Sequence, residues 1–300
     1  MPSERPVPAR PHAGWLAVIL LRGLALLPMP LLWLAGAALG EALFAAGVRR
    51  QVVLRNLARC LAPADRRALH RLARAHYRAL GLALLSTGIP WWASERRLAR
   101  LVRLRDRHHY DGALAAGRNV ILLVPHFLGL EASLCLSRER PLVIMYQRLR
   151  NPVLDRVMRR GRSRYGAYLA ERSAPLKGLV ARLKGGAPFI YLPDQNPGPR
   201  RGVFAPFFGI ETATHPALGR FARTADAVVI PLMCRQRPRG RGYELRFFPP
   251  LADFPTGDPR ADAAAMNRVV EALVRADPAQ YFWVHRRFKL RPPGEPPFYE

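Results

Sequence analysis

Short apolar segments alternate with longer segments of helical periodicity over the last two thirds of this 300-residue chain. The apolar segments are rich in Val, Ile and Leu and are bounded by turn-forming residues, as is typical of buried strands. Fully apolar strands separated by helices indicate a mixed, largely parallel sheet flanked by helices, and therefore an α/β fold. Strands are expected at 120–124, 142–146, 189–192 and 228–233, and helices at 152–162, 175–184, 216–224 and 260–276.

The N-terminal part of the chain is apolar in a different way. Gly23–Gly40 carries no charged residue over 18 positions, which just reaches the length that crosses a bilayer core. Pro28 and Pro30 would kink such a helix, which membranes tolerate. More arginines follow the segment than precede it, so the positive-inside rule places the bulk of the chain in the cytoplasm. We predict an N-terminal membrane helix within an anchor at 1–48, and a cytoplasmic domain at 49–300. The alternative is a buried helix or one that lies flat in the interface.

Residues 63–85 combine apolar and basic positions at helical spacing. Such a basic amphipathic helix suits an anionic membrane surface, and equally suits packing on a protein core with a solvated outer face. The two tryptophans that follow, Trp91 and Trp92, fit either the headgroup level of a membrane or an ordinary core. Both alternatives stay open for this region.

The charge of the chain is strongly positive: it has 48 Lys and Arg and 21 Asp and Glu, a formal net charge of +27. An excess of this size indicates an acidic partner such as a nucleic acid, an anionic membrane or a phosphorylated substrate. Half of the residues are hydrophobic, which excludes a disordered basic tail. The three cysteines, Cys60, Cys135 and Cys234, form no recognisable disulfide framework or zinc motif, so a reducing compartment is expected.

The strongest candidate for chemistry is a histidine directly after the first predicted strand. His126 and Glu131 stand five residues apart, on either side of Gly129. Five residues of continuous helix would leave the two side chains about 140° apart, so they can meet only if His126 lies in the loop and Glu131 in the next helix. A base and an orienting acid at a strand end can turn a hydroxyl into a nucleophile.

Several further motifs, in this order, resemble those of the lipid A late acyltransferases, the lauroyl and myristoyl transferases of Gram-negative outer-membrane synthesis. The resemblance covers nearly the whole chain, and its C-terminal motif is the most specific part. Pro125 and Asn196 depart from the residues that the family often carries. The motifs are RNL at 55–57, GRNVILLVPHFLGLE at 117–131, QRLRNP at 147–152, RRGR at 159–162, PDQNPG at 193–198, GVFAPFFG at 202–209 and QYFWVHRRFKLRPPGE at 280–295.

The resemblance implies a glycerolipid-acyltransferase-like fold at the bacterial inner membrane. It also implies transfer of an acyl chain from acyl carrier protein to the 3-hydroxyl of a hydroxyacyl chain on a Kdo-bearing lipid A precursor. His126 would take the hydroxyl proton, and Glu131 would hold and stabilise the imidazole. The reaction needs no cofactor and no metal. Candidate substrate-binding residues are Arg159 and Arg162, for phosphate or oxyanion contacts, and Asp194 and Gln195, for sugar hydroxyls. A catalytic role for Asp194 and Gln195, or a cap on the following loop, stays open as an alternative.

Other functions are compatible with parts of the sequence. The same pair of residues would suit an acyltransferase for another glycolipid, or a thioesterase in which water replaces the acceptor hydroxyl. Aromatic and basic residues alternate near Trp283, as in single-strand binders, but no nucleic-acid-binding fold is recognisable, and we expect no nucleic-acid partner. His108 and His109 lack a third metal ligand and are expected in a surface turn.

Overall fold

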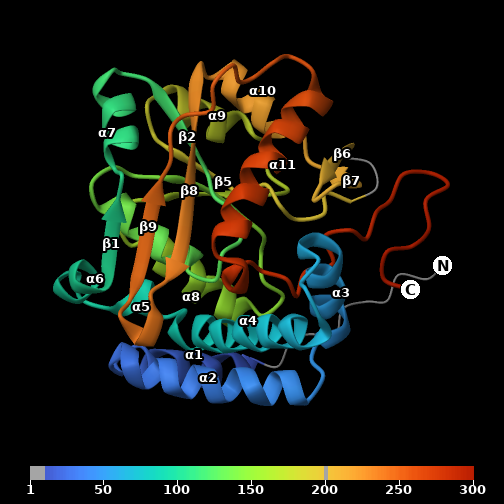
Figure 1. Ribbon diagram of the computed structural model, residues 1–300. Coiled ribbons are helices and arrows are strands. Elements are labelled where there is room, and N and C mark those ends of the chain that lie inside the picture. Colours follow the sequence, from blue (N-terminus) through green and yellow to red (C-terminus); the bar gives the residue numbers. More distant parts are fainter. Residues whose placement is uncertain (1–10, 199–201) are drawn as a thin grey trace.

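The computed structural model describes residues 11–198 and 202–300 and has a seven-stranded sheet at its centre (Figure 1). Five neighbouring strands, in the order β8-β2-β5-β3-β4, run parallel, whereas β9 and β1 run antiparallel to them at one edge. The mixed, largely parallel sheet predicted from the sequence is therefore confirmed. The strands are β1 (Val102–Arg105), β2 (Asn119–Leu123), β3 (Val143–Tyr146), β4 (Tyr168–Glu171), β5 (Phe189–Tyr191), β8 (Ala227–Gln236) and β9 (Tyr243–Phe247), with a separate hairpin of β6 (Val203–Phe207) and β7 (Ile210–Thr214).

Helices cover both faces of the sheet and one of its ends. The predicted helices at 152–162, 175–184, 216–224 and 260–276 are confirmed, whereas His108 and His109 begin a helix, not a turn. The helices are α1 (Pro11–Leu24), α2 (Met29–Ala45), α3 (Arg50–Leu61), α4 (Arg66–Ser86), α5 (Ile89–Trp92), α6 (Glu95–Leu101), α7 (His108–Ala115), α8 (Pro152–Arg162), α9 (Lys177–Lys184), α10 (Ala217–Thr224) and α11 (Pro259–Ala276), with short 3-10 helices η1 (Leu130–Arg138), η2 (Pro238–Gly240) and η3 (Pro278–Gln280).

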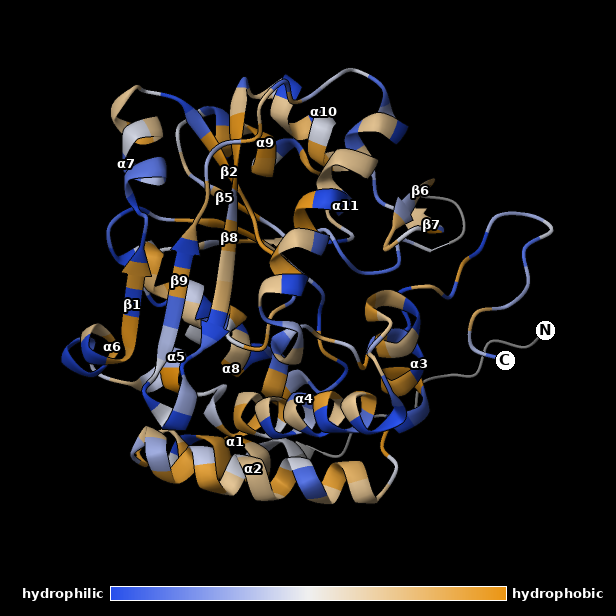
Figure 2. Ribbon diagram, viewed as in Figure 1, coloured by the Kyte–Doolittle hydropathy of each residue, from blue (hydrophilic) through white to orange (hydrophobic). Residues whose placement is uncertain are grey.

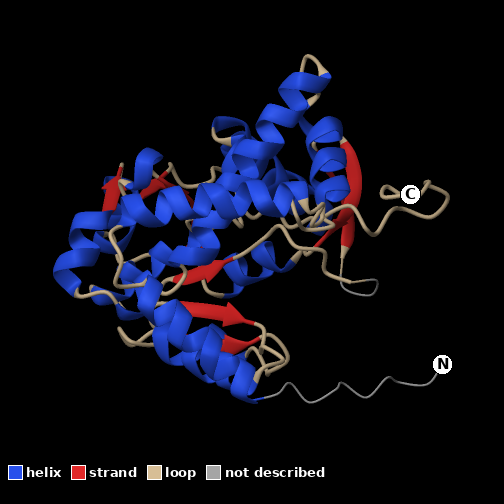
Figure 3. Ribbon diagram, turned by 90° about the horizontal axis from the view of Figure 1, so that it is seen from below, coloured by secondary structure: helices blue, strands red, loops and turns tan. Residues whose placement is uncertain are grey.

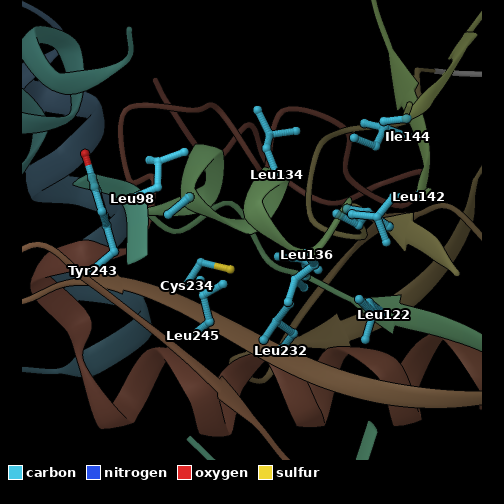
Figure 4. Packing of buried hydrophobic residues seen from close by; sticks show 14 of the residues in the cluster. Leu98, Leu122, Leu134, Leu136, Leu142, Ile144, Leu232, Cys234, Tyr243 and Leu245 are labelled. Atoms are coloured by element: carbon cyan, nitrogen blue, oxygen red, sulfur yellow. The ribbon is translucent and has the colours of Figure 1, made fainter. Parts of the chain in front are cut away.

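The central strand β2 is buried on both faces from residue 120 to 123, which explains the unbroken apolar sequence after its first residue, Asn119. Leu122 faces one hydrophobic cluster, shared with β8 and η1, whereas Ile121 and Leu123 face another that lies against α9 and α10. Figure 4 shows the first cluster around Leu122, Leu232 and Leu136. Alternate residues of a strand point to opposite faces, so a strand covered on both sides has no polar position.

The apolar N-terminal segment forms two helices where the sequence analysis predicted one membrane helix over Gly23–Gly40. α1 ends at Leu24 and α2 begins at Met29, with Pro28 extended at the N-cap position. Proline lacks the N–H that a continuing helix requires and disfavours helical geometry in the residue before it, so the break follows from the sequence. In the described part of the chain no single helix is long and apolar enough to cross a membrane; α2 and α3, bent by 94°, meet the length and composition criterion only together.

α2 packs backbone to backbone against α4 beneath the rest of the molecule (Figure 1). A Cβ added at Gly36 would lie 2.6 Å from the Cα of Leu82, and Gly40 and Gly81 are similarly close to the facing backbone. Side chains at these positions would force the helices apart. The amphipathic helix expected at 63–85 is α4, and its buried face includes Ala73, Tyr77 and Leu82.

We expect Gly36→Ala to lower the free energy of unfolding by about 1–3 kcal/mol, because the added methyl group meets the backbone of α4. Gly112→Ala is the matched control: this α7 glycine has nothing within 4 Å of the added Cβ. That change should stabilise the protein by about 0.5–1 kcal/mol through helix propensity. Denaturant titration of both variants in the same detergent checks the expectation, and equal stabilisation by both would contradict the close packing of α2 on α4.

Candidate active site at the carboxyl end of the sheet

The candidate site is built where β2 and β5 end side by side. These strands are paired in parallel, with Leu123 opposite Tyr191. His126 and Asp194 each lie three residues further along, so both side chains emerge at the same edge of the sheet. In open α/β sheets this carboxyl edge is where ligands bind. His126, Asp194 and Gln195 line one small pocket at this edge.

Asp194 holds His126 by two hydrogen bonds. The backbone N–H of His126 donates to Oδ2 at 2.9 Å, and Nδ1 of its ring lies 2.6 Å from Oδ1. Burial on its own raises the pKa of Asp194, but the charge and hydrogen bonds of His126, with a hydrogen bond from Tyr281, outweigh it and hold the pKa below its usual value. An ionised Asp194 accepts, so Nδ1 carries the proton and Nε2 of the neutral ring is left with the lone pair.

Gln195 occupies the other side of the ring. Its Nε2 lies 3.1 Å from Nε2 of His126 and donates to the lone pair there. His126 keeps 19% of its side chain exposed, against 3% for Asp194. The basic nitrogen is therefore the accessible end of the pair, and a hydroxyl group that displaced the Gln195 amide would meet it directly.

Glu131 does not take the expected place beside the imidazole. It lies in the first turn of η1, as the spacing predicted, but it pairs with Arg162 and accepts from Trp91 Nε1 at 3.1 Å. The expected His126–Glu131 pairing is thus replaced by His126–Asp194 and Glu131–Arg162. The backbone of Gly129 does not require a glycine, because its φ of −96° is open to any residue. The close packing does, because a Cβ there would lie 2.8 Å from the carbonyl oxygen of Cys234.

The two candidate arginines have different surroundings. Arg159 is exposed, with its guanidinium 5.8 Å above the ring of Tyr146. Arg162 is partly buried, and although burial lowers its pKa, the charge and hydrogen bonds of Glu131 raise it above the usual value. Arg162 lines a cavity of about 460 Å³ that also includes His126, whereas Arg159 is not among its lining residues.

The cavity beside His126 combines an apolar wall with cationic groups. Its apolar part comes from the ends of β3 and β5 and from α10, and its arginines include two that sequence reasoning did not single out. Hydrocarbon and an anionic group could thus both be held next to the histidine. The lining residues include His126, Leu130, Met145, Arg162, Arg172, Leu192, Gln195, Arg220 and Phe221.

The C-terminal segment, residues 280–289, fixes the loop that carries His126. The backbone N–H groups of Leu128 and Phe282 donate to Gln280 and His126 at 2.8 and 3.0 Å, forming a short antiparallel contact. Asn56 donates to the carbonyl groups of Trp283 and His285 at 2.8 and 3.1 Å. Motifs from both ends of the chain therefore meet at the site.

His285 supports the loop after β5 and is not a second base in this arrangement. Its Nε2 accepts from the backbone N–H of Asn196 at 3.1 Å. Burial, together with nearby positive groups, lowers the pKa of His285 to about 4 in spite of the charge of Asp194. The neutral ring therefore keeps Nε2 as an acceptor for Asn196, which directly follows Asp194 and Gln195.

Comparison with known proteins decides what kind of site this is. The sequence profile described as bacterial lipid A biosynthesis acyltransferase matches residues 5–290, almost the whole chain. The chain belongs to the bacterial lipid A biosynthesis acyltransferase family. It is similar to the lipid A biosynthesis lauroyltransferase of Escherichia coli strain K12, with 34% identity over 288 residues that cover 95% of this chain and 94% of the relative.

Two further relatives place the chain in the same family. The lipid A biosynthesis palmitoleoyltransferase of Escherichia coli strain K12 is 30% identical over 280 residues, covering 91% of this chain and 90% of the relative. The myristoyltransferase of the same strain is 34% identical over 178 residues, covering 59% of this chain and 55% of the relative. The protein is accordingly an acyltransferase of lipid A biosynthesis, as the resemblance of its motifs indicated.

Sequence reasoning singled out most of the residues that meet at the candidate site, but not all of their pairings. Asp194 was predicted as a substrate-binding residue, and its position three residues after an apolar strand was the signal for a larger role. Arg172 directly follows β4, a strand that was not predicted, and Arg220 lies inside the helix predicted at 216–224. Neither carried a signal of its own among 48 basic residues. Within the described residues no cluster of three or more His, Cys, Asp or Glu could hold a metal ion.

We expect acid to destabilise the folded enzyme partly through His285. Its folded pKa of about 4 lies below the ordinary value near 6.5, so the stabilisation is complete above about pH 6.5 and is lost as pH falls toward 4. At pH 5 the loss should approach about 2 kcal/mol. His285→Gln keeps an acceptor for Asn196 but cannot titrate, so its unfolding free energy should fall less between pH 7.5 and pH 5. An identical pH dependence of the two proteins in denaturant titrations would contradict this assignment.

Proposed function

We propose that this acyltransferase moves a fatty acyl chain from acyl carrier protein to the 3-hydroxyl of a hydroxyacyl chain on a Kdo-bearing lipid A precursor. The observation that carries the proposal is a histidine base, clamped by a buried carboxylate, beside a cavity that offers both apolar and cationic walls. The apolar wall suits the acyl chain, the histidine base suits attack on the thioester, and the cationic wall suits a phosphorylated sugar. The relatives are lipid A biosynthesis acyltransferases, which supports lipid A as the acceptor class.

In the proposed reaction the acceptor hydroxyl displaces the Gln195 amide from Nε2 of His126. The imidazole takes the hydroxyl proton as the oxygen attacks the thioester carbonyl, and ionised Asp194 stabilises the imidazolium that forms. Collapse of the tetrahedral intermediate breaks the carbon–sulfur bond. The proton then passes from His126 to the departing thiolate, which regenerates the neutral base.

We assign Arg162 the role of holding negative charge next to the histidine, and Glu131 the role of positioning Arg162. Arg162 lies in the cavity wall, and its Nε is 3.1 Å from Oε1 of Glu131 behind it. A guanidinium anchored on one side can still present its other N–H groups to an oxyanion or a phosphate. Arg159 would contact a phosphate only outside the cavity, from its exposed place above Tyr146.

The partners in this proposal are all acidic. Acyl carrier protein, phosphate and Kdo groups on the acceptor, and an anionic inner membrane would each be attracted by a net charge of +27. We propose that the enzyme works at the cytoplasmic face of the inner membrane, where acyl carrier protein is available. No cofactor, metal or nucleic acid enters the reaction.

The proposal is tested with membranes that contain the protein, acyl carrier proteins loaded with a series of chain lengths, and a tetra-acylated Kdo-lipid acceptor. We expect mass spectrometry to show one added acyl group per acceptor, and His126→Ala to abolish it. Free fatty acid released faster than acylated lipid would indicate a thioesterase. Acylation of a different glycolipid but not of the Kdo-lipid would show that the acceptor belongs to another glycolipid class.

The pairing of His126 is tested by comparing two carboxylates in that assay. Asp194→Asn should lower kcat by about 10³–10⁴-fold, because the amide no longer favours the tautomer with a basic Nε2. It should also change the pH dependence of kcat/KM. Glu131→Gln should lower activity mainly by loosening Arg162, and should leave the shape of the pH profile unchanged. The reverse pattern, with the profile altered by Glu131→Gln and kept by Asp194→Asn, would return the orienting role to Glu131.

A further inference from the structure

The sheet edge formed by β1, β9 and the end of β8 has one face that is open to solvent and rich in arginine. Arg103 and Arg105 of β1 and Arg246 of β9 are exposed there, whereas Leu104 and Leu245 at the alternate positions pack into the core. Figure 2 shows β9 and the lower end of β8 in hydrophilic colours, with no helix drawn in front of β9. We define the cationic face by its arginines, Arg103, Arg105, Arg235, Arg237, Arg239, Arg241 and Arg246.

The strand register places like charges side by side on the cationic face. Arg105 of β1 lies directly opposite Arg246 of β9. Glu244 lies opposite Arg103 on one side and opposite Arg235 of β8 on the other. Like charges directly opposite one another destabilise a sheet, and an anionic partner bound to both would remove that repulsion.

The acids around the cationic face neutralise only part of its charge. Glu244, Asp277 and Asp106 pair with arginines of the three strands. The turn at η2 adds further positive charge, and burial together with the charge of Arg103 lowers the pKa of Arg237. Within the described part of the chain, four of the arginines form no ion pair: Arg103, Arg237, Arg239 and Arg241.

The cationic face borders the loop that carries His126. A Cβ added at Gly129 of that loop would lie 2.9 Å from the backbone carbonyl carbon of Arg235. The side chain of Gln236, the last residue of β8, donates to the carbonyl oxygen of Leu128 at 3.3 Å. An acyl chain that is delivered by a protein bound at this face therefore starts beside the candidate site.

We propose that the cationic face is where acyl carrier protein docks when it delivers the donor acyl group. The proposal rests on the acyl transfer proposed above, because it names the surface that meets the protein part of the donor. Acyl carrier protein is acidic, and the planar guanidinium of arginine suits its carboxylates. A second copy of this chain, with a formal charge of +27, would be repelled from the same face.

The position of the cationic face suits a soluble protein better than a lipid surface. Most of the exposed large apolar side chains lie on α1, α2 and the turn between them, where Leu16 is 69% and Leu26 77% exposed. These helices form the lower side of the molecule in Figure 2, and Figure 3, viewed from below, shows helices in front of much of the sheet. The cationic strands β1 and β9 face the viewer in Figure 1 and are not part of that lower side. A bilayer along α1 and α2 would thus leave the cationic face in water.

Two double variants of equal charge test the docking surface. Arg103→Gln with Arg241→Gln removes two exposed charges from the cationic face, and Lys184→Gln with Arg223→Gln removes two from exposed sites on α9 and α10, at the other end of the molecule (Figure 1). We expect the first variant to raise the KM for acyl carrier protein loaded with an acyl chain about five- to tenfold at low ionic strength, and less as salt is added. The control should change this KM by less than about twofold. With acyl-phosphopantetheine, a donor that lacks the protein, the first variant should show a much smaller rise.

Equal KM changes in the two variants, or an equal rise for both donors, would overturn the docking surface. Absence of transfer by the parent protein would instead overturn the proposed function, and binding of fluorescently labelled acyl carrier protein to the full-length protein in detergent then decides the surface. The first variant should raise the Kd about five- to tenfold, and an unchanged Kd would refute the assignment. Weaker flotation of the first variant with phosphatidylglycerol vesicles, at unchanged KM and Kd, would assign the face to lipid.

Discussion

The double hydrogen bond from His126 to Asp194 is the interaction on which the candidate site depends. It joins the ends of two neighbouring parallel strands, and it uses both the backbone N–H and the ring of the histidine. The carboxylate of Asp194 therefore fixes both the backbone of the loop after β2 and the tautomer of the His126 ring. Burial of the ionised Asp194 costs desolvation, and the hydrogen bonds that it accepts from His126 offset that cost only while both partners are present.

Around this pair the fold separates two tasks that the sequence motif had appeared to combine. His126 is oriented by β5, whereas Glu131 turns toward α8 and holds a guanidinium in the cavity wall. In the proposed reaction, proton transfer and charge binding are thus supported by different helices and strands. Acyl transfer requires both within one small volume, and the cavity beside His126 brings them there.

The sequence predicted the strands well where burial on both faces makes them continuously apolar, and poorly where one face meets solvent. β2 and β8 are covered on both faces and read as continuous apolar runs, but β1, with the sequence VRLR, alternates because one face meets solvent. The choice of Asp194 over Glu131 depended on β5 lying beside β2, a contact between residues 68 positions apart. Sequence spacing favoured Glu131, because a short segment gives no information about which strands are neighbours in the sheet. The break between α1 and α2, by contrast, was signalled by Pro28.

The contacts of Asn56 with residues 283 and 285 also bear on how the enzyme is made. They span 227 and 229 residues, and the bond from Tyr299 to Asn56 spans 243. Bringing such distant segments together is a late and entropically costly event in folding. During synthesis the β2 loop emerges from the ribosome long before the C-terminal segment that fastens it. The candidate site can therefore be completed only after the C-terminal segment has been synthesised.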